Sequence, residues 1–154
     1  MQKLVLHSTL SLILFAACIK DKFQDKPTVE IKSVNPTQVS VLSGSYSEIL
    51  MEFTDKQGDL DSVILYKNRL NSVAKPLLNP RLVYPIPAFP KKTKGDLKVT
   101  LLNTDLNAVS EPRSQPDAPN GKEPDTIVLK IIIIDKAGNV SDTATTEQLV
   151  IERS

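Results

Sequence analysis

The chain has 154 residues, with 19 basic and 18 acidic side chains, one cysteine, one histidine and no tryptophan. This length fits one domain, and a single cysteine excludes an intrachain disulfide framework or a cysteine-rich metal cluster. A net charge of +1 argues against a protein that binds nucleic acid by neutralising phosphates, so we expect no nucleic-acid partner.

The chain begins with a targeting segment that ends in the cysteine. Lys3 precedes an apolar run that is too short to span a bilayer, which needs about 20 apolar residues. Residues 1–17 therefore predict a lipoprotein signal peptide. Phe15-Ala16-Ala17-Cys18 resembles a bacterial lipobox, which implies that Cys18 carries lipid and anchors the protein to a membrane. The two alternatives are a secretory signal without lipid and a buried N-terminal helix.

Cleavage before Cys18 changes the chemistry that the chain offers. It removes Lys3 and His7, which leaves 18 basic and 18 acidic side chains and no histidine. Ser-His-Asp and Cys-His catalysis and zinc sites built from His or Cys are then excluded, and we expect a protein that is not an enzyme. Paired carboxylates in the 103–125 segment are the remaining catalytic alternative, but the sequence cannot place two of them about 5–9 Å apart.

Residues 18–27 are charged and lack periodicity, which is typical of a flexible tether between an anchor and a domain. Lys20-Asp21 resembles the charged export signal of some surface lipoproteins from Bacteroidetes-type bacteria. This resemblance implies a lipid-anchored protein on the surface side of the outer membrane. The alternative is a solvated linker, which leaves the periplasmic face of the outer membrane open.

Alternating apolar and polar residues dominate segment 28–154 and predict one domain built from β-strands. In chain order, the predicted strands cover residues 29–31, 38–42, 48–53, 62–67, 97–102, 126–134 and 145–152. No segment has the pattern of a long amphipathic helix. About seven short strands without helices predict an all-β fold, an Ig-like antiparallel sandwich of two packed sheets.

The segment 126–134 is the most apolar of these strands and contains four consecutive isoleucines. β-Branched side chains favour a strand over a helix, and an exposed edge strand of this composition would aggregate. We therefore expect this strand at the centre of a sheet.

Two proline-containing segments, 75–95 and 103–125, interrupt the pattern. Proline lacks the N–H that a sheet needs, so we expect loops or edge segments there. Tyr84 and Phe89 in the first segment have two interpretations. They anchor a binding partner, as aromatic side chains often do, or they pack into the rim of the sandwich.

Two acidic turns separate predicted strands, one over residues 53–61 and one over residues 135–142. If both turns lie at one end of the sandwich, their carboxylates can bind calcium, which takes about 6–8 oxygen ligands. The candidate ligands are Asp55, Asp59, Asp61 and Asp135. The alternative is structural, since Asp and Asn side chains cap tight turns by accepting hydrogen bonds from backbone amides.

The same turns carry a family resemblance. They read Phe53-Thr54-Asp55-Lys56-Gln57-Gly58-Asp59-Leu60 and Asp135-Lys136-Ala137-Gly138-Asn139. In this order they resemble small Ig-like lipoproteins of Bacteroidetes-type bacteria, which show F-x-D-x-x-G-D-[IL] and D-x-A-G-N turns. The resemblance implies the fold and the location rather than an activity.

We therefore expect a non-catalytic interaction or adhesion-type module of the cell envelope, with a protein or glycan partner at the cell surface. This expectation rests on the predicted anchor at Cys18, the missing catalytic side chains and the proline-rich loops. Loops on a rigid scaffold often carry binding residues. The alternative is an accessory subunit of an outer-membrane nutrient-uptake or assembly complex.

Overall fold

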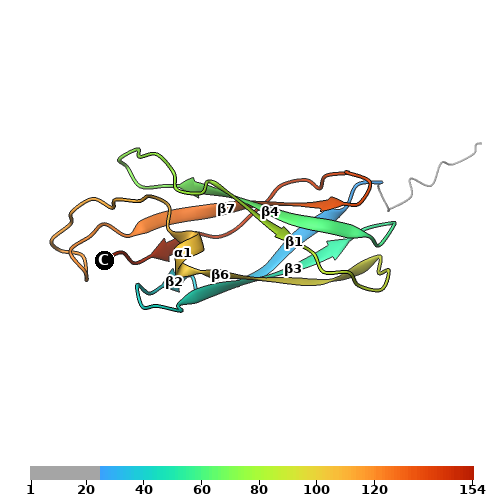
Figure 1. The fold of residues 1–154 in the computed structure, drawn as a ribbon, viewed down its shortest axis with the longest axis horizontal. Helices are drawn as coiled ribbons and strands as arrows, with labels where there is room; N and C mark the ends of the chain where they lie inside the picture. Colours follow the sequence, from blue (N-terminus) through green and yellow to red (C-terminus); the bar gives the residue numbers. More distant parts are fainter. Residues whose placement is uncertain (1–24) are drawn as a thin grey trace, which may run out of the picture.

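A computed structural model describes residues 25–154, which form two β-sheets packed face to face (Figure 1). The predicted signal peptide and Cys18 lie outside the described residues. Within residues 25–154, no helix is both long enough and apolar enough to cross a membrane. The elements in chain order are β1 (Thr28–Asn35), β2 (Gln38–Val39), β3 (Tyr46–Thr54), β4 (Leu60–Arg69), β5 (Arg81–Pro85), β6 (Lys94–Leu102), α1 (Asn103–Leu106), β7 (Asp125–Asp135), β8 (Ala144–Thr145) and β9 (Leu149–Ile151).

The strand order is that of an Ig-like sandwich. One sheet has the order β1-β3-β6, and the other has the order β2-β9-β7-β4-β5, with β8 also paired to β7. The pairs are antiparallel except for the short parallel pair of β2 and β9. In Ig nomenclature, β1, β3 and β6 correspond to strands A, B and E, and β9, β7, β4 and β5 of the facing sheet correspond to G, F, C and C′. The predicted all-β sandwich is confirmed.

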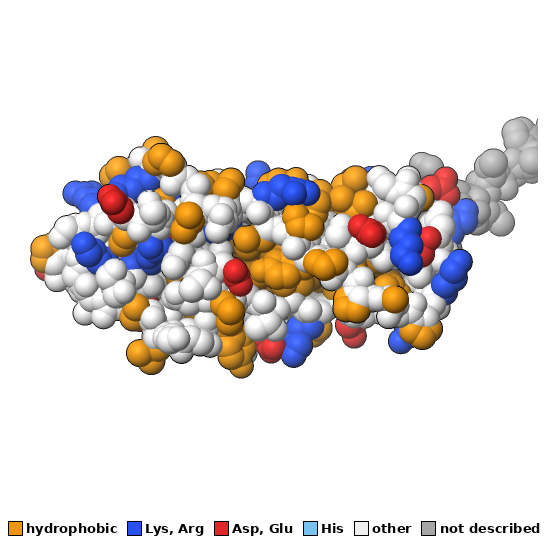
Figure 2. Space-filling view, in the orientation of Figure 1, with side chains coloured by type: hydrophobic (Ala, Val, Ile, Leu, Met, Phe, Trp, Pro, Cys, Tyr) orange, Lys and Arg blue, Asp and Glu red, His pale blue; other side chains and the backbone are white. Residues whose placement is uncertain are grey.

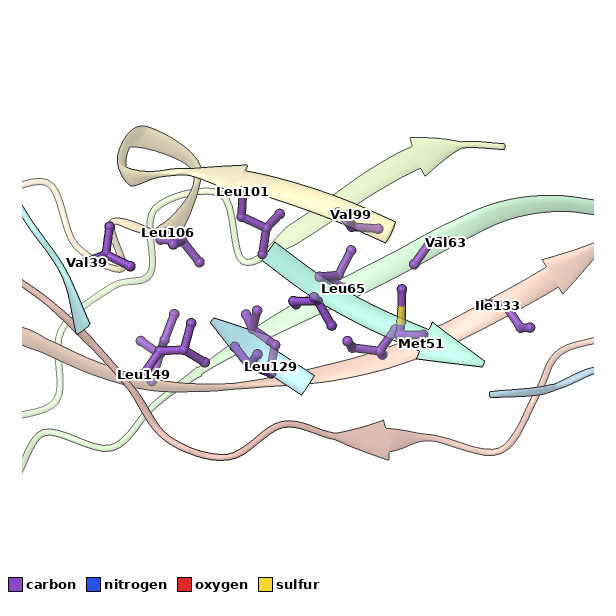
Figure 3. Packing of buried hydrophobic residues seen from close by; sticks show 14 of the residues in the cluster. Val39, Met51, Val63, Leu65, Val99, Leu101, Leu106, Leu129, Ile133 and Leu149 are labelled. Carbon is purple, nitrogen blue, oxygen red and sulfur yellow. The ribbon is translucent and has the colours of Figure 1, made fainter. Parts of the chain in front are cut away.

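Period-two burial builds the core between the sheets. Along β7, the side chains at alternate positions from Ile127 to Ile133 are fully buried, and those between them are partly exposed or exposed. β3 supplies Ile49, Met51 and Phe53 from the opposite sheet in the same way. Figure 3 shows these two layers of side chains meeting between the ribbons. Each fully buried aliphatic side chain stabilises the fold by about 1.5–3 kcal/mol.

The isoleucine-rich strand is central, as its composition predicts. β7 lies between β9 and β4 in its sheet. Ile132 and Ile134 point to the outer face, where Ile132 lies opposite the buried Ile64 of β4. The outer face of this sheet is therefore partly apolar as well.

The proline-containing segment 75–95 holds an edge strand, in agreement with the expected loops or edge segments. β5 lies inside this segment at the edge of its sheet and pairs with β4 alone. At that edge, Pro85 costs no ladder hydrogen bond. The predicted last strand, 145–152, is split into β8 and β9, because the Thr146 hydroxyl takes the place of a backbone acceptor for the Leu129 N–H at 2.9 Å.

The sandwich has two distinct ends, separated by the length of β7, about 35 Å for eleven residues. We call them the N-terminal end, which holds residue 25 and the β3–β4 and β7–β8 turns, and the far end, which holds α1, the C-terminus and the 107–124 loop (Figure 1). Residues 25–27, expected in the tether, pack on the domain. Asp25 pairs with Lys56 at 3.6 Å, Lys26 pairs with Asp142 at 2.6 Å, and Pro27 is buried.

Candidate functional site

Three of the four predicted acidic ligands meet at the N-terminal end. One carboxylate oxygen from each of Asp55, Asp59 and Asp135 lies within 4.8 Å of the other two. Asp135 ends β7, and its partner in the antiparallel register is Leu60, the first residue of β4, so Asp59 lies next to it. Asp55 follows β3 in the other sheet. The cluster therefore joins the two sheets.

Part of this arrangement is turn capping. The Asp59 N–H donates to Asp55 Oδ2 at 2.9 Å, and the Asn139 N–H and Nδ2 donate to Asp135 Oδ1 and Oδ2, both at 2.8 Å. The two turns also contact each other, because the Lys136 N–H donates to the Asp59 carbonyl at 3.0 Å. These bonds agree with the structural interpretation of the acidic turns.

Capping leaves other oxygens of the same turn without a partner. Asp55 Oδ1, Asp59 Oδ1 and Gln57 Oε1 are buried and accept no hydrogen bond within residues 25–154. The Asp55 residue is 1% exposed. In that part of the chain, no ion pair from lysine or arginine reaches any carboxylate of the cluster. Buried oxygens without donors cost stability, so these three are the unusual feature of the site.

The fourth predicted ligand, Asp61, lies outside the cluster. It follows Leu60 on β4, and because side chains alternate along a strand, it is exposed while Leu60 is buried. Its backbone carbonyl accepts the Ile86 N–H at 2.8 Å. Asp61 therefore helps to hold the loop after β5 and is not a member of the carboxylate group.

A second loop closes over the acidic turn. The Asp55 N–H donates to the Thr93 carbonyl at 2.9 Å. Gly58 has a φ of +65°, and a Cβ added there would lie 2.7 Å from the Lys92 backbone nitrogen. The turn therefore requires glycine at this position for two reasons. The backbone conformation is unfavourable for other residues, and the 90–94 loop leaves no room for a side chain.

Tyr84 and Phe89 are both half-buried and pack against the core. The Phe89 ring meets Phe53 edge to face, with ring centroids 6.1 Å apart. Burial raises the pKa of the Tyr84 phenol above its ordinary value, and the charge of Asp105 acts in the same direction. The two aromatic residues line neighbouring shallow hollows rather than a single one. This placement agrees with packing into the rim of the sandwich.

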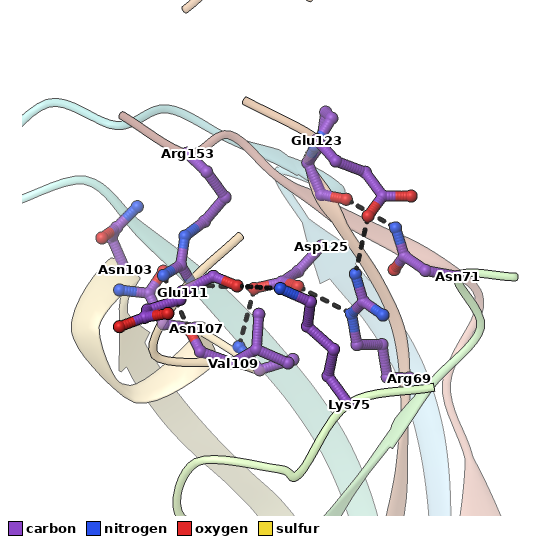
Figure 4. Close-up of polar contacts among 12 residues, drawn as sticks. Arg69, Asn71, Lys75, Asn103, Asn107, Val109, Glu111, Glu123, Asp125 and Arg153 are labelled. Carbon is purple, nitrogen blue, oxygen red and sulfur yellow. Dashed lines mark hydrogen bonds and ion pairs between the residues drawn. The ribbon is translucent and has the colours of Figure 1, made fainter. Parts of the chain in front are cut away.

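The far end contains a buried ionic network that the sequence analysis did not predict (Figure 4). Asp125, 0% exposed, accepts hydrogen bonds from Arg69 Nε at 2.8 Å, Arg153 Nη1 at 2.7 Å and the Ala108 N–H at 2.9 Å. Arg69 also pairs with Glu123 at 3.1 Å. The network therefore ties β4, β7, the C-terminus and the loop after α1 together.

Lys67 adds a second link between β4 and the segment after β6. Its ammonium group donates to the carbonyls of Asp105 at 2.8 Å and Asn107 at 2.7 Å. Burial lowers the pKa of Lys67 below its ordinary value, while the nearby carboxylates of Asp105 and Asp125 act in the opposite direction. A signal for these links was present in the sequence, since Lys67 and Arg69 continue the inward-facing positions of Val63 and Leu65 on β4.

The acidic side chains of segment 103–125 mostly have structural partners. Asp105 Oδ2 accepts the Leu102 N–H at 3.1 Å, and both Glu123 and Asp125 bind Arg69. Asp117 is exposed. Carboxylates whose oxygens already accept hydrogen bonds from arginine are occupied in holding the fold together.

Comparison of the sequence with protein-family models and with curated proteins finds no match. The similarity of the two turns to Bacteroidetes-type lipoproteins stays a prediction.

Proposed function

We propose that this protein is a lipid-anchored, non-catalytic interaction module of the cell envelope, held at the outer membrane through Cys18. The observation that carries the proposal is that the described chain enters the sandwich at one end, where Asp25 and Lys26 pair with the turns (Figure 1). Cys18 and Asp25 are seven positions apart in the sequence, which allows a span of at most about 25 Å. An anchor at Cys18 would therefore keep the N-terminal end near the bilayer and direct the far end away from it.

The far end has the properties of a binding surface. Its loops are positioned by the Asp125 network, and such preorganisation lowers the entropy cost of binding. Lys75 links the 70–80 loop to the 107–124 loop, because its ammonium group donates to the Glu111 carbonyl at 2.6 Å. The 70–80 loop exposes three large aliphatic side chains, Leu70, Val73 and Leu78.

These side chains favour a protein partner over a glycan, because sugars stack mainly on aromatic rings. The charges on the drawn face support the same choice. Figure 2 shows blue and red side chains interspersed, with hydrophobic side chains gathered near the middle. A phosphate-rich partner would instead call for one continuous basic surface.

Site-specific photocrosslinking in intact bacteria tests this proposal. A photoreactive residue replaces Ser72 in the exposed far-end loop, and the matched control replaces Ala137, which is exposed in the β7–β8 turn at the N-terminal end. We expect an envelope-protein adduct from position 72, none from position 137, and loss of the adduct in a Cys18→Ala chain.

Identical adducts from both positions, or none from position 72, would overturn the proposal. If the adduct is an outer-membrane uptake or assembly protein that copurifies in equal amount, the protein is an accessory subunit of that complex.

A further inference from the structure

We propose that Asp55, Asp59 and Asp135 bind one divalent cation, calcium by preference, with Gln57 in the same turn as a further oxygen ligand. The site joins the β3–β4 turn to the end of β7. This inference does not depend on the lipid anchor or on a partner at the far end, so either proposal can fail without the other.

The spacing of the three carboxylates fits one ion. Their nearest oxygens all lie within 4.8 Å of one another. Calcium binds oxygen at about 2.3–2.6 Å, so ligands on opposite sides of the ion are separated by about 4.6–5.2 Å. A cation among the three oxygens is therefore within coordination distance of each after small side-chain adjustments.

The buried oxygens without donors are an independent indication of a ligand. Asp55 is almost fully buried, and its Oδ2 accepts the Asp59 amide while its Oδ1 accepts nothing. Asp59 Oδ1 and the amide oxygen of Gln57 are in the same condition. A cation bound among the carboxylates would give Asp55 Oδ1 and Asp59 Oδ1 a partner, and Gln57 lies in the same turn between β3 and β4.

Within residues 25–154, no lysine or arginine side chain neutralises the three carboxylates. Lys91 and Lys136 line a hollow beside Asp59, but neither forms an ion pair with the cluster. Three carboxylates within 4.8 Å repel one another when ionised. A divalent ion would remove this repulsion.

The ligand types favour calcium over other metals. All the donors are oxygens, which disfavours zinc and copper, since those metals prefer nitrogen and sulfur. Asp55 and Asp59 come from the turn that connects the two sheets, and Asp135 comes from the end of β7. Calcium tolerates irregular geometry, whereas magnesium demands a near-ideal octahedron and keeps several waters.

Calorimetric titration of the full chain with calcium chloride, together with thermal melts in EDTA and in about 5 mM calcium, tests the proposal. The main variant is Asp59→Asn, because no hydrogen bond to the Asp59 carboxylate would be broken. Asp55→Asn is a second variant that keeps an acceptor for the Asp59 amide. The matched control is Asp61→Asn, an exposed carboxylate just beyond the same turn.

We expect one calcium ion per chain and a rise in Tm of about 5 °C or more with calcium. Asp59→Asn and Asp55→Asn should weaken calcium binding at least about tenfold and remove the rise, while melting in EDTA at or above the parent temperature. Asp61→Asn should behave as the parent does.

Three results would overturn the proposal. They are no calcium heat with equal melts in both buffers, calcium binding that survives in both cluster variants, and equal loss in Asp61→Asn. Magnesium that binds as tightly as calcium would overturn the preference for calcium.

Discussion

Gly58 is confined by its own backbone conformation and by the backbone of the neighbouring 90–94 loop. Its φ of +65° is unfavourable for other residues, and the Lys92 backbone leaves no room for a Cβ. A backbone neighbour cannot move aside as the end of a flexible side chain can. The same residue shapes the turn that carries Asp55 and Asp59, so conformation and the candidate ligands are linked at this position.

We predict that Gly58→Ala lowers the free energy of unfolding by about 2–4 kcal/mol, because strain and a steric clash add. The control is Gly121→Ala, where φ is +67° but no atom lies within 4 Å of the added Cβ. That variant should lose about 1 kcal/mol. Urea denaturation of both variants measures the difference, and equal losses would contradict the steric account.

Tyr84 gives a pH-dependent prediction. Burial raises its pKa in the folded protein above the unfolded value near 10. The folded state therefore keeps its proton when the unfolded state has lost it. The stability contributed by Tyr84 is fully present below pH 10 and is lost as the pH rises through the folded pKa.

We expect the tyrosinate absorbance of the folded protein to contain a component that titrates above the ordinary tyrosine range, and Tyr84→Phe to remove it. The same substitution should flatten the loss of stability above pH 10. If Tyr84→Phe instead removes only absorbance that titrates in the ordinary tyrosine range, the phenol is not shielded from water.

At the scale of elements, β7 carries both special sites of the domain. Asp125 begins the strand in the arginine network, and Asp135 ends it in the acidic cluster. Between them, the alternate side chains fill the core. The strand thus holds the two ends of the sandwich at a fixed separation and couples each to the hydrophobic core.

We predict that Asp125→Ala destabilises the protein by about 3–5 kcal/mol, because it leaves Arg69 and Arg153 buried without their partner. Asp117→Ala, at an exposed position in the loop before β7, should change stability by less than about 0.5 kcal/mol. Equilibrium denaturation of the two variants is the measurement. A small loss for Asp125→Ala would mean that water enters and solvates the arginines.

The sequence predicted the strands that fill the core, because alternation of apolar residues depends on the local chain alone. It predicted β7 and its central place from the isoleucines. β5 was the harder case, since Pro80 precedes it, Pro85 is its last residue, and its pairing with β4 depends on the rest of the fold.

The acidic cluster was predictable in part. The turn motifs indicated Asp55, Asp59 and Asp135. Their carboxylates come together only because β4 and β7 are neighbours and β3 ends at the same end of the sandwich. The exclusion of Asp61 depends on strand phase, which places it on the exposed side of β4. The inward-facing positions of Lys67 and Arg69 on β4 indicate that these cations need partners. The Asp125 network joins residues up to 84 positions apart along the chain, Arg69 and Arg153, so no local pattern indicates which partners they have.

At the scale of the molecule, the two ends have different roles in this account. The N-terminal end carries the first described residues and the candidate cation site. The far end carries loops held by buried ion pairs and exposed aliphatic side chains. The proposed anchor at Cys18 would give this polarity a direction relative to the membrane.

The most direct test of the anchor is metabolic labelling with an alkyne fatty acid, followed by membrane fractionation, in a bacterium with an outer membrane. The parent chain is compared with Cys18→Ala. We predict that the parent takes up label and fractionates with the outer membrane, and that Cys18→Ala does neither. A parent chain without label, or a Cys18→Ala chain that is labelled and membrane-bound like the parent, would contradict the account.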